Sequence, residues 1–332
     1  MRCNKIKISF FLILLILFSS CNETENEVII DRKMIDENTL EFNVDGITFR
    51  MKHVLPGSAY LGLQNNDSLL PKYLDHNLIY CMYLSKVTFT YDFWIAETEV
   101  TQELWEKVMG YNNSYFKGPK NPVENVNFYE IVTFFMKLNT MFNYDVTYTL
   151  TDSGLLASWD KIPETGSINR VNFRKGFRLP LDFEWEYAAH GGQNLDINEY
   201  LYSGKNIDDI AWYQKNSNNT THAVGQKRPN KLGLYDMTGN VFEFTNNCYT
   251  FTEPDSVIAG GIFCFTNPLL FYKEYANQGG YSYNLGLCGG AYNSDTNQCF
   301  LAYRVSTFDE YMNFSDKASV YGFRILFLNS HK

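Results

Sequence analysis

Histidine is scarce in this chain, and its five copies among 332 residues show no clustering of the kind that metal ligands need. The seven cysteines fit no zinc-ligand spacing either. These two absences exclude a structural zinc site. Long apolar runs are also lacking, because the run from Phe10 to Phe18 is well short of the roughly 20 residues that a helix needs to cross a bilayer.

Basic residues are too few for a nucleic-acid partner. The chain has 28 Lys and Arg against 37 Asp and Glu, a formal net charge of −9. Removal of residues 1–20 would take away three basic residues and no acidic one, which leaves −12. Binding to nucleic acid depends on neutralising phosphates with Lys and Arg, so this class of partner is excluded.

The first 20 residues have the layout of a signal peptide. Arg2, Lys5 and Lys7 precede the short apolar run, and two serines and Cys21 follow it. Small residues before a cysteine are what a lipoprotein signal peptidase requires. We therefore predict that Cys21 is the acylated first residue of the mature chain and anchors it to a membrane, with the outer membrane as the expected location. The alternative is an ordinary cleaved signal peptide with a free Cys21.

Two further segments complete the predicted organisation. Residues 21–41 are rich in acidic and poor in apolar side chains, which predicts a solvated acidic tether. Residues 42–332 show no internal repeat and no change of composition that would mark a boundary. A length of about 290 residues suits one large domain or two small ones, and we predict a single domain.

Capping residues predict three helices. Thr101 can cap a helix that ends at Met109, and Asn127 with Glu130 forms a capping pair before a strongly apolar helix. A third helix is expected at residues 182–189. Two strands around a turn are predicted between residues 42 and 63, and another strand at residues 89–95. Glycines punctuate the chain after Asn194, so no long helix is expected there.

Nine short motifs, in this order along the chain, carry a resemblance. They are Glu97–Gln102 with Trp105, Asn121–Val126, Phe177–Ala189, Ala211–Tyr213, Asn216–Ser217, Thr221–Gly225, Asn230–Glu243, Gly289–Gly290 and Gly322–Arg324. Together they resemble the formylglycine-generating enzyme (sulfatase-modifying factor) family, from about Phe42 to Leu326. The resemblance implies a single α+β domain with the formylglycine-generating-enzyme fold, which is C-type-lectin-like and low in regular secondary structure.

The loop from Asp236 to Glu243 is a candidate calcium site. Calcium takes six to eight oxygen ligands, and this loop can offer two carboxylates and the carbonyls of Gly239 and Val241. In the family that it resembles, the matched positions bind calcium. The alternative is a capped turn in which Glu243 is held by a salt bridge. The resemblance places a second calcium site at four further residues, namely Asp209, Ile210, Asn216 and Asn218.

The oxidase chemistry of the family is expected to be missing. Active members hold copper(I) between two cysteine thiolates separated by four residues, with a serine just upstream, and soft thiolates are what copper(I) selects. The resemblance places Ala291 at that serine, Ser294 at the first cysteine and Cys299 at the second. A serine hydroxyl stays protonated near neutral pH and does not replace a thiolate.

Cys288 leaves three alternatives open for Cys299. The two cysteines form a disulfide, or Cys299 is a free buried thiol, or the pair is a displaced copper site.

Three other side chains have structural interpretations. His222 is expected to pack rather than to catalyse. Glu184 and Glu186 lie two residues apart on a helix and therefore point to different faces, which makes paired acid and base catalysis improbable. Arg178 is the expected partner for one of them.

The segment 246–287 departs most from the family and is rich in aromatic residues. It is expected either to form a peptide or glycan surface or to pack an enlarged loop onto the core. These features lead us to expect a lipid-anchored, non-oxidase binding or scaffold module of the cell envelope. One alternative is an oxidase that uses Cys288 and Cys299 on sulfatase cysteine. Another is a component of a secretion, gliding or glycan-uptake assembly.

Overall fold

The computed structural model describes ten stretches of the chain. They are residues 29–62, 84–144, 148–150, 168–170, 175–193, 206–246, 256–258, 262–266, 285–306 and 316–329. The predicted signal peptide, Cys21 and most of the aromatic segment 246–287 lie outside the described residues. Within these stretches, no helix has both the length and the apolar character needed to span a membrane.

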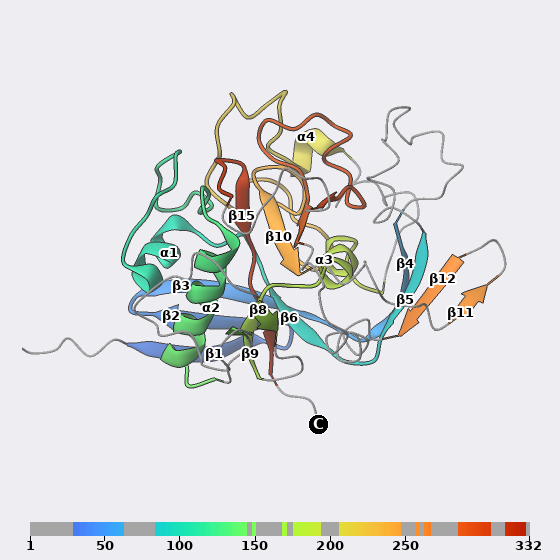
Figure 1. Ribbon diagram of the computed structural model, residues 1–332, viewed down its shortest axis with the longest axis horizontal. Helices are drawn as coiled ribbons and strands as arrows, with labels where there is room; N and C mark the ends of the chain where they lie inside the picture. Colours follow the sequence, from blue (N-terminus) through green and yellow to red (C-terminus); the bar gives the residue numbers. More distant parts are fainter. Residues whose placement is uncertain are drawn as a thin grey trace, which may run out of the picture.

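The largest sheet has six strands in the order β1-β2-β3-β6-β16-β9, and all neighbours in it are antiparallel. The strands β1, β2 and β3 of this sheet lie along the lower part of the molecule in Figure 1. The strand β16 lies between β6 and β9, so the end of the family-like region is an interior strand of the sheet. The strands are β1 (Ile30–Asp36), β2 (Thr39–Val44), β3 (Ile47–Val54), β6 (Phe93–Ala96), β16 (Leu326–Leu328) and β9 (Gly176–Arg178).

Smaller sheets surround this one. A four-stranded sheet has the order β14-β13-β10-β15, and another has the order β11-β12-β5-β4. The strands β7 (Tyr148–Leu150) and β8 (Ile168–Arg170) form a two-stranded antiparallel sheet. The strands of the two four-stranded sheets are β14 (Val305–Ser306), β13 (Leu285–Cys288), β10 (Phe242–Asn246), β15 (Tyr321–Phe323), β11 (Ser256–Ile258), β12 (Ile262–Thr266), β5 (Ser85–Phe89) and β4 (Gly57–Leu61).

The helices begin where the capping residues predict. Thr101 caps α1 (Gln102–Met109), and Asn127 and Glu130 form both bonds of a capping box on α2 (Phe128–Met141). The predicted third helix is α3 (Asp182–Ala189), and the fourth, α4 (Ile207–Ile210), is a single turn. After Asn194, the described residues contain no longer helix than α4, as the glycine-rich sequence indicates.

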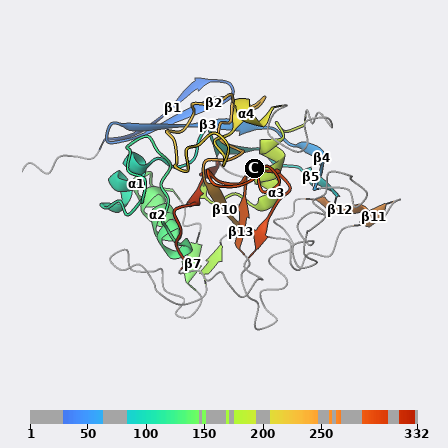
Figure 2. The same cartoon turned by 90° about the horizontal axis from the view of Figure 1, so that it is seen from above.

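In the described residues, two large apolar clusters form most of the core, and a small third cluster lies beside α4. In the first, α1 and α2 pack against each other and against the large sheet, with the Trp105 and Phe134 rings stacked at a centroid distance of 5.5 Å (Figure 2). The second cluster gathers around α3 and contains the fully buried Trp185. The first cluster is mostly aromatic and β-branched, whereas the second also contains many leucines and alanines. Burying a large apolar side chain contributes about 1.5–3 kcal/mol. The α+β class predicted from the sequence is confirmed.

The predicted ends of the strands need correction. β1 lies inside the segment 21–41 that was expected to be a tether, so the sheet begins at Ile30 rather than near Phe42. Between Phe42 and Leu63 there are parts of three strands, because Asp45 and Gly46 form an additional turn with positive φ angles. The predicted strand at 89–95 is divided between β5 and β6.

Candidate functional site

The loop from Asp236 to Glu243 leads into β10 and lies against the segment that follows α4. Gly239 has a φ of +83°, and a Cβ at this position would lie 2.3 Å from the carbonyl oxygen of Trp212. Asn240 donates its backbone N–H to that same carbonyl at 2.7 Å. The loop can approach Trp212 this closely only because residue 239 is glycine.

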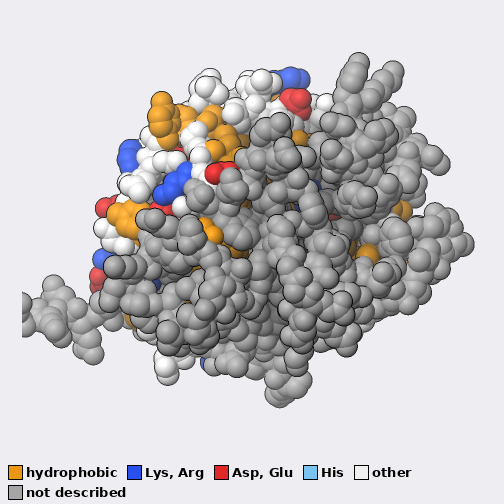
Figure 3. Space-filling view, viewed as in Figure 1, with side chains coloured by type: hydrophobic (Ala, Val, Ile, Leu, Met, Phe, Trp, Pro, Cys, Tyr) orange, Lys and Arg blue, Asp and Glu red, His pale blue; other side chains and the backbone are white. Residues whose placement is uncertain are grey.

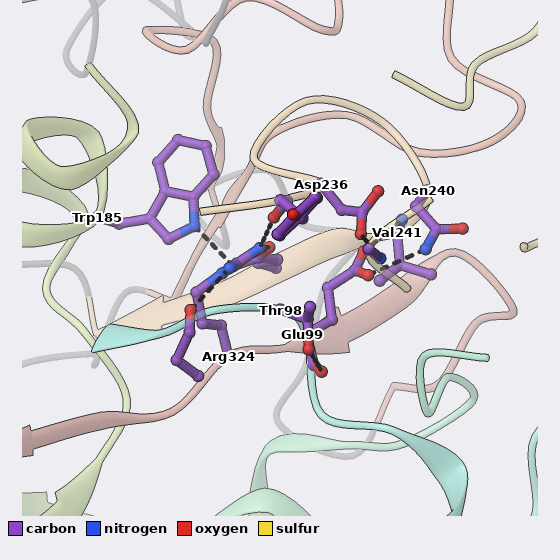
Figure 4. A network of polar contacts seen from close by, with 11 residues as sticks. Thr98, Glu99, Trp185, Asp236, Asn240, Val241 and Arg324 are labelled. Carbon is purple, nitrogen blue, oxygen red and sulfur yellow. Dashed lines mark hydrogen bonds and ion pairs between the residues drawn. The ribbon is translucent and has the colours of Figure 1, made fainter. Parts of the chain in front are cut away.

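Glu243 is held by a buried arginine. The Nη2 of Arg324 lies 2.6 Å from Oε1 of Glu243, and its Nε lies 2.9 Å from Oε2. The indole N–H of Trp185 donates to Oε2 at 2.7 Å. Figure 4 shows Arg324 beside Trp185 in this network. The salt-bridged turn that the sequence left open as an alternative is therefore present.

Two more carboxylates lie close to this ion pair. Glu99 accepts the side-chain N–H of Asn240 at 2.9 Å and the backbone N–H of Val241 at 3.3 Å (Figure 4). Asp236 accepts the backbone N–H of Gly225 through Oδ2 at 2.7 Å. Its other oxygen, Oδ1, is buried and has no hydrogen-bond partner among the described residues. The cluster thus contains three carboxylates and one guanidinium.

Burial changes the acidity of these carboxyl groups. Burial, and then the nearby charges of Asp236 and Glu243, raise the pKa of Glu99 well above its usual value. Burial also raises the pKa of Asp236, to about 6, although the Gly225 N–H and Arg324 oppose the change. Each group resists ionisation chiefly because removal from water penalises its charged form.

The cluster fits a hard cation at one point. The unpartnered Oδ1 of Asp236 is a buried oxygen of the kind that calcium takes as a ligand. Glu243 is already bonded to Arg324 and Trp185, and no three His, Cys, Asp or Glu side chains in the described stretches converge to hold a metal. A calcium ion here would be held by Asp236 and, as the resemblance implies, by the carbonyls of Gly239 and Val241, whereas Glu243 is engaged by Arg324.

The residues of the second predicted calcium site serve local structure. Asn216 accepts the N–H of Tyr213 at 2.9 Å and donates to the carbonyl of Ala211, which closes the turn after α4. Asp209 lies 3.8 Å from Arg228 in an exposed ion pair. Ile210 is buried, and Asn218 is exposed with a φ of +55°. The turn therefore already uses the oxygen that Asn216 was expected to offer.

The loop at Gly289–Cys299 has no pair of thiols at the family positions. The Ser294 hydroxyl accepts the N–H of Ala291 at 2.9 Å and is buried, so it closes its own turn. Cys299 is buried beside Ile210, Ala211 and Tyr213.

Cys288 is a free thiol, as is Cys299, and no disulfide joins them. It belongs to the cluster around α3, whereas Cys299 belongs to the one beside α4. Burial raises the pKa of each thiol to about 12, which disfavours the thiolate that copper(I) requires. Cys299 is thus a buried thiol without a disulfide to Cys288.

His222 has a packing role, as expected. Its ring stacks on Trp212 with centroids 3.8 Å apart, and Nε2 lies 2.7 Å from the carbonyl oxygen of Ser217. The ammonium of Lys227 lies over the same indole ring at 4.1 Å.

The two glutamates of α3 point to different partners. Arg178 forms a two-bond pair with Glu184, with both distances at 2.7 Å, which confirms the predicted partnership. Glu186 pairs with Arg304 at 2.6 Å, and all four of these side chains are buried. No role was predicted from the sequence for Arg304, Arg324 or Glu99. Glu99 and Arg324 lie inside the motifs Glu97–Gln102 and Gly322–Arg324.

A pocket of about 230 Å³ lies next to this cluster. Glu99, which belongs to the cluster with Asp236 and Glu243, lines this pocket. The other charged residues that line it are Arg50, Glu97, Glu103 and Lys120. Solvent can therefore approach to within one side chain of the buried carboxylates.

Comparisons with known proteins agree with this geometry. Residues 48–327 match the family described as Sulfatase-modifying factor enzyme 1-like domain. The chain is 39% identical over 175 residues to Chaperone protein LppX of Paenibacillus barcinonensis, across 46% of this chain and 61% of that protein. It is 30% identical over 100 residues to Inactive C-alpha-formylglycine-generating enzyme 2 of Bos taurus, across 26% of this chain and 32% of that protein. The matches thus span less than two thirds of both curated relatives.

Solved structures share the fold over most of the chain. Treponema denticola variable protein 1 has a TM-score of 0.67 at 30% identity, covering 86% of this chain and 98% of that one. CarF has a TM-score of 0.57 at 24% identity, covering 83% and 96%. PvdO from Pseudomonas aeruginosa has a TM-score of 0.52 at 17% identity, covering 84% and 94%. At these low identities, CarF and PvdO show only that the fold is shared.

The Arg324→Met substitution should destabilise the protein strongly. It would leave Glu243 buried without its cation, and breaking a buried ion pair costs about 3–5 kcal/mol. Urea unfolding of the variant and the parent measures this loss. The control is Arg50→Met, which removes an exposed pair with Glu41 and should cost less than about 1 kcal/mol. Equal losses in the two variants would contradict the structural importance of the buried pair.

Proposed function

Because the chain belongs to the sulfatase-modifying factor enzyme 1-like domain family, we propose that it is a lipid-anchored, non-oxidase binding or scaffold module of the cell envelope. The observation that carries the proposal is the state of Ser294. Its hydroxyl is bonded inside its own turn, and Cys299 has no second thiol at the family spacing. A two-coordinate copper(I) site has too few sulfurs here.

The relatives support a role without oxidation. One of them carries the word "inactive" in its name, and another is named a chaperone. A chaperone acts by contact with other proteins, so we favour a peptide segment or an envelope-assembly protein as the partner, with a glycan as the other candidate.

The surface offers places for such contacts. In the described stretches, large hydrophobic side chains are exposed at six positions, and Tyr115 is the most exposed of them at 73%. Figure 3 shows hydrophobic side chains gathered over the part of the molecule above α1, with basic and acidic groups beside them. Exposed aromatic groups rimmed by polar ones are typical of protein contact sites.

Membrane attachment rests on the sequence. Acylation of Cys21 would place the domain at the membrane surface, in the periplasm or on the cell exterior, through the short segment before β1. Attachment by lipid needs no spanning helix.

The absence of oxidase activity can be tested with the purified full chain. We expect that protein loaded with copper(I) and supplied with oxygen leaves the cysteine of a sulfatase peptide unchanged, as measured by mass spectrometry. An active member of the family, treated in the same way, serves as the positive control. Formylglycine in the peptide would disprove the non-oxidase proposal.

Calcium is the cofactor that we propose for the Asp236 loop. A ligand that binds only the folded state stabilises it by mass action, so excess chelator should lower the melting temperature and added calcium should restore it. Asp236→Ala should abolish this change in melting temperature. Asp209→Ala should do so only if calcium binds at the second predicted site. If excess chelator leaves the melting temperature of both the parent and Asp236→Ala unchanged, the loop holds no calcium.

A further inference from the structure

The strand β1 forms an exposed edge of the large sheet (Figures 1 and 2). Its side chains from Asp31 to Asp36 are all exposed. Met34 is 59% exposed and Ile35 is 44% exposed, so two adjacent large apolar side chains lie on this edge. In the described part of the chain, β1 pairs with β2 and with no second strand.

The hydrogen bonds show which backbone groups point away from the sheet. Asp45 donates its N–H to the carbonyl of Ile29 at 2.7 Å, so residue 29 faces β2. Along an antiparallel strand, the backbone N–H and C=O groups of successive residues point alternately toward the paired strand and away from it. The backbone groups of Ile30, Arg32 and Met34 therefore point away from β2. In agreement, the N–H of Arg32 donates to the neighbouring Asp31 side chain at 2.7 Å instead of to β2.

The charges along this edge are arranged in two halves. Arg32 and Lys33 precede the apolar pair Met34 and Ile35, and Asp36 and Glu37 follow it. An antiparallel partner of the same sequence runs in the opposite direction, so its acidic half faces the basic half of the first strand. Charges on an edge strand normally discourage pairing with other strands. Here the basic-then-acidic order favours an antiparallel copy of the same strand, because opposite charges then lie across from each other.

We propose that β1 is a self-pairing edge, to which β1 of a second copy of this chain adds in the antiparallel direction. With the two Met34 residues opposite each other, the basic residues before Met34 in each copy lie across from the acidic residues after it in the partner, shifted by one position because β1 has an irregularity between Met34 and Asp36. The outward N–H and C=O groups then continue the ladder across both sheets. A strand this short gives a small and weak interface, and the proposed anchor would concentrate the two copies at one membrane surface.

Cross-linking tests the contact between the two Met34 positions. In the full chain in its membranes, Met34→Cys should give a disulfide-linked dimer on mild oxidation. The control is Tyr60→Cys, since Tyr60 is 48% exposed on β4, at the edge of another sheet. Equal cross-linking of the two variants, or none with Met34→Cys, would overturn the proposal.

Charge exchange tests the choice of partner. In the Met34→Cys background, Arg32→Glu or Asp36→Arg alone should lower cross-linking about fivefold, because each places like charges opposite each other. A mixture of the two variants should restore it, since every facing pair then has opposite charges. Melting temperatures check that each variant folds. If the charge variants cross-link as much as Met34→Cys alone, the two copies meet only because both lie on the lipid surface, which would contradict self-pairing.

Discussion

The ion pair between Arg324 and Glu243 connects most of the elements around the candidate site. Arg324 is fully buried, and besides Glu243 it donates to the carbonyls of Ala96 and Tyr235. Glu243 in turn accepts the indole N–H of Trp185 from α3. One guanidinium thus connects β6, the loop before Asp236, β10 and, through Trp185, the second apolar cluster. Since a buried charge without its partner is very costly, these elements cannot separate independently.

Two further buried pairs repeat this design on α3. Glu184 bonds Arg178, and Glu186 bonds Arg304. In a domain with so few and such short helices and strands, these bonds fix loops that regular secondary structure would otherwise position. The family scaffold is therefore kept intact in a chain that lacks the thiol pair. In the loop Gly289–Cys299, Ser294 closes its own turn at the position where the resemblance places the first cysteine.

Local signals predicted the helices correctly, since Thr101, Asn127 and Glu130 act on backbone groups within three residues of themselves. The capping box of α2 could be read directly from the sequence. The turn at Asp45 was missed although Asp-Gly is a typical hairpin turn sequence. The strand β1 was missed because its charged residues give no alternating strand pattern. Only pairing with β2 orders it.

Long-range partners could not be predicted in the same way. Glu243 and Arg324 are 81 residues apart, and Glu186 and Arg304 are 118 apart. The residues of the candidate calcium loop were identified by motif, but the motif does not show that Arg324 already occupies the carboxylate of Glu243. Only the folded arrangement decides between these two uses of one side chain.

A copper(I) competition titration of the parent protein and of Ser294→Cys tests the account most directly. The variant restores a cysteine at the family spacing from Cys299. The account predicts that the parent takes no copper(I) from a competing chelator, whereas Ser294→Cys takes one equivalent. Binding of copper(I) by the parent as tightly as by the variant would contradict it.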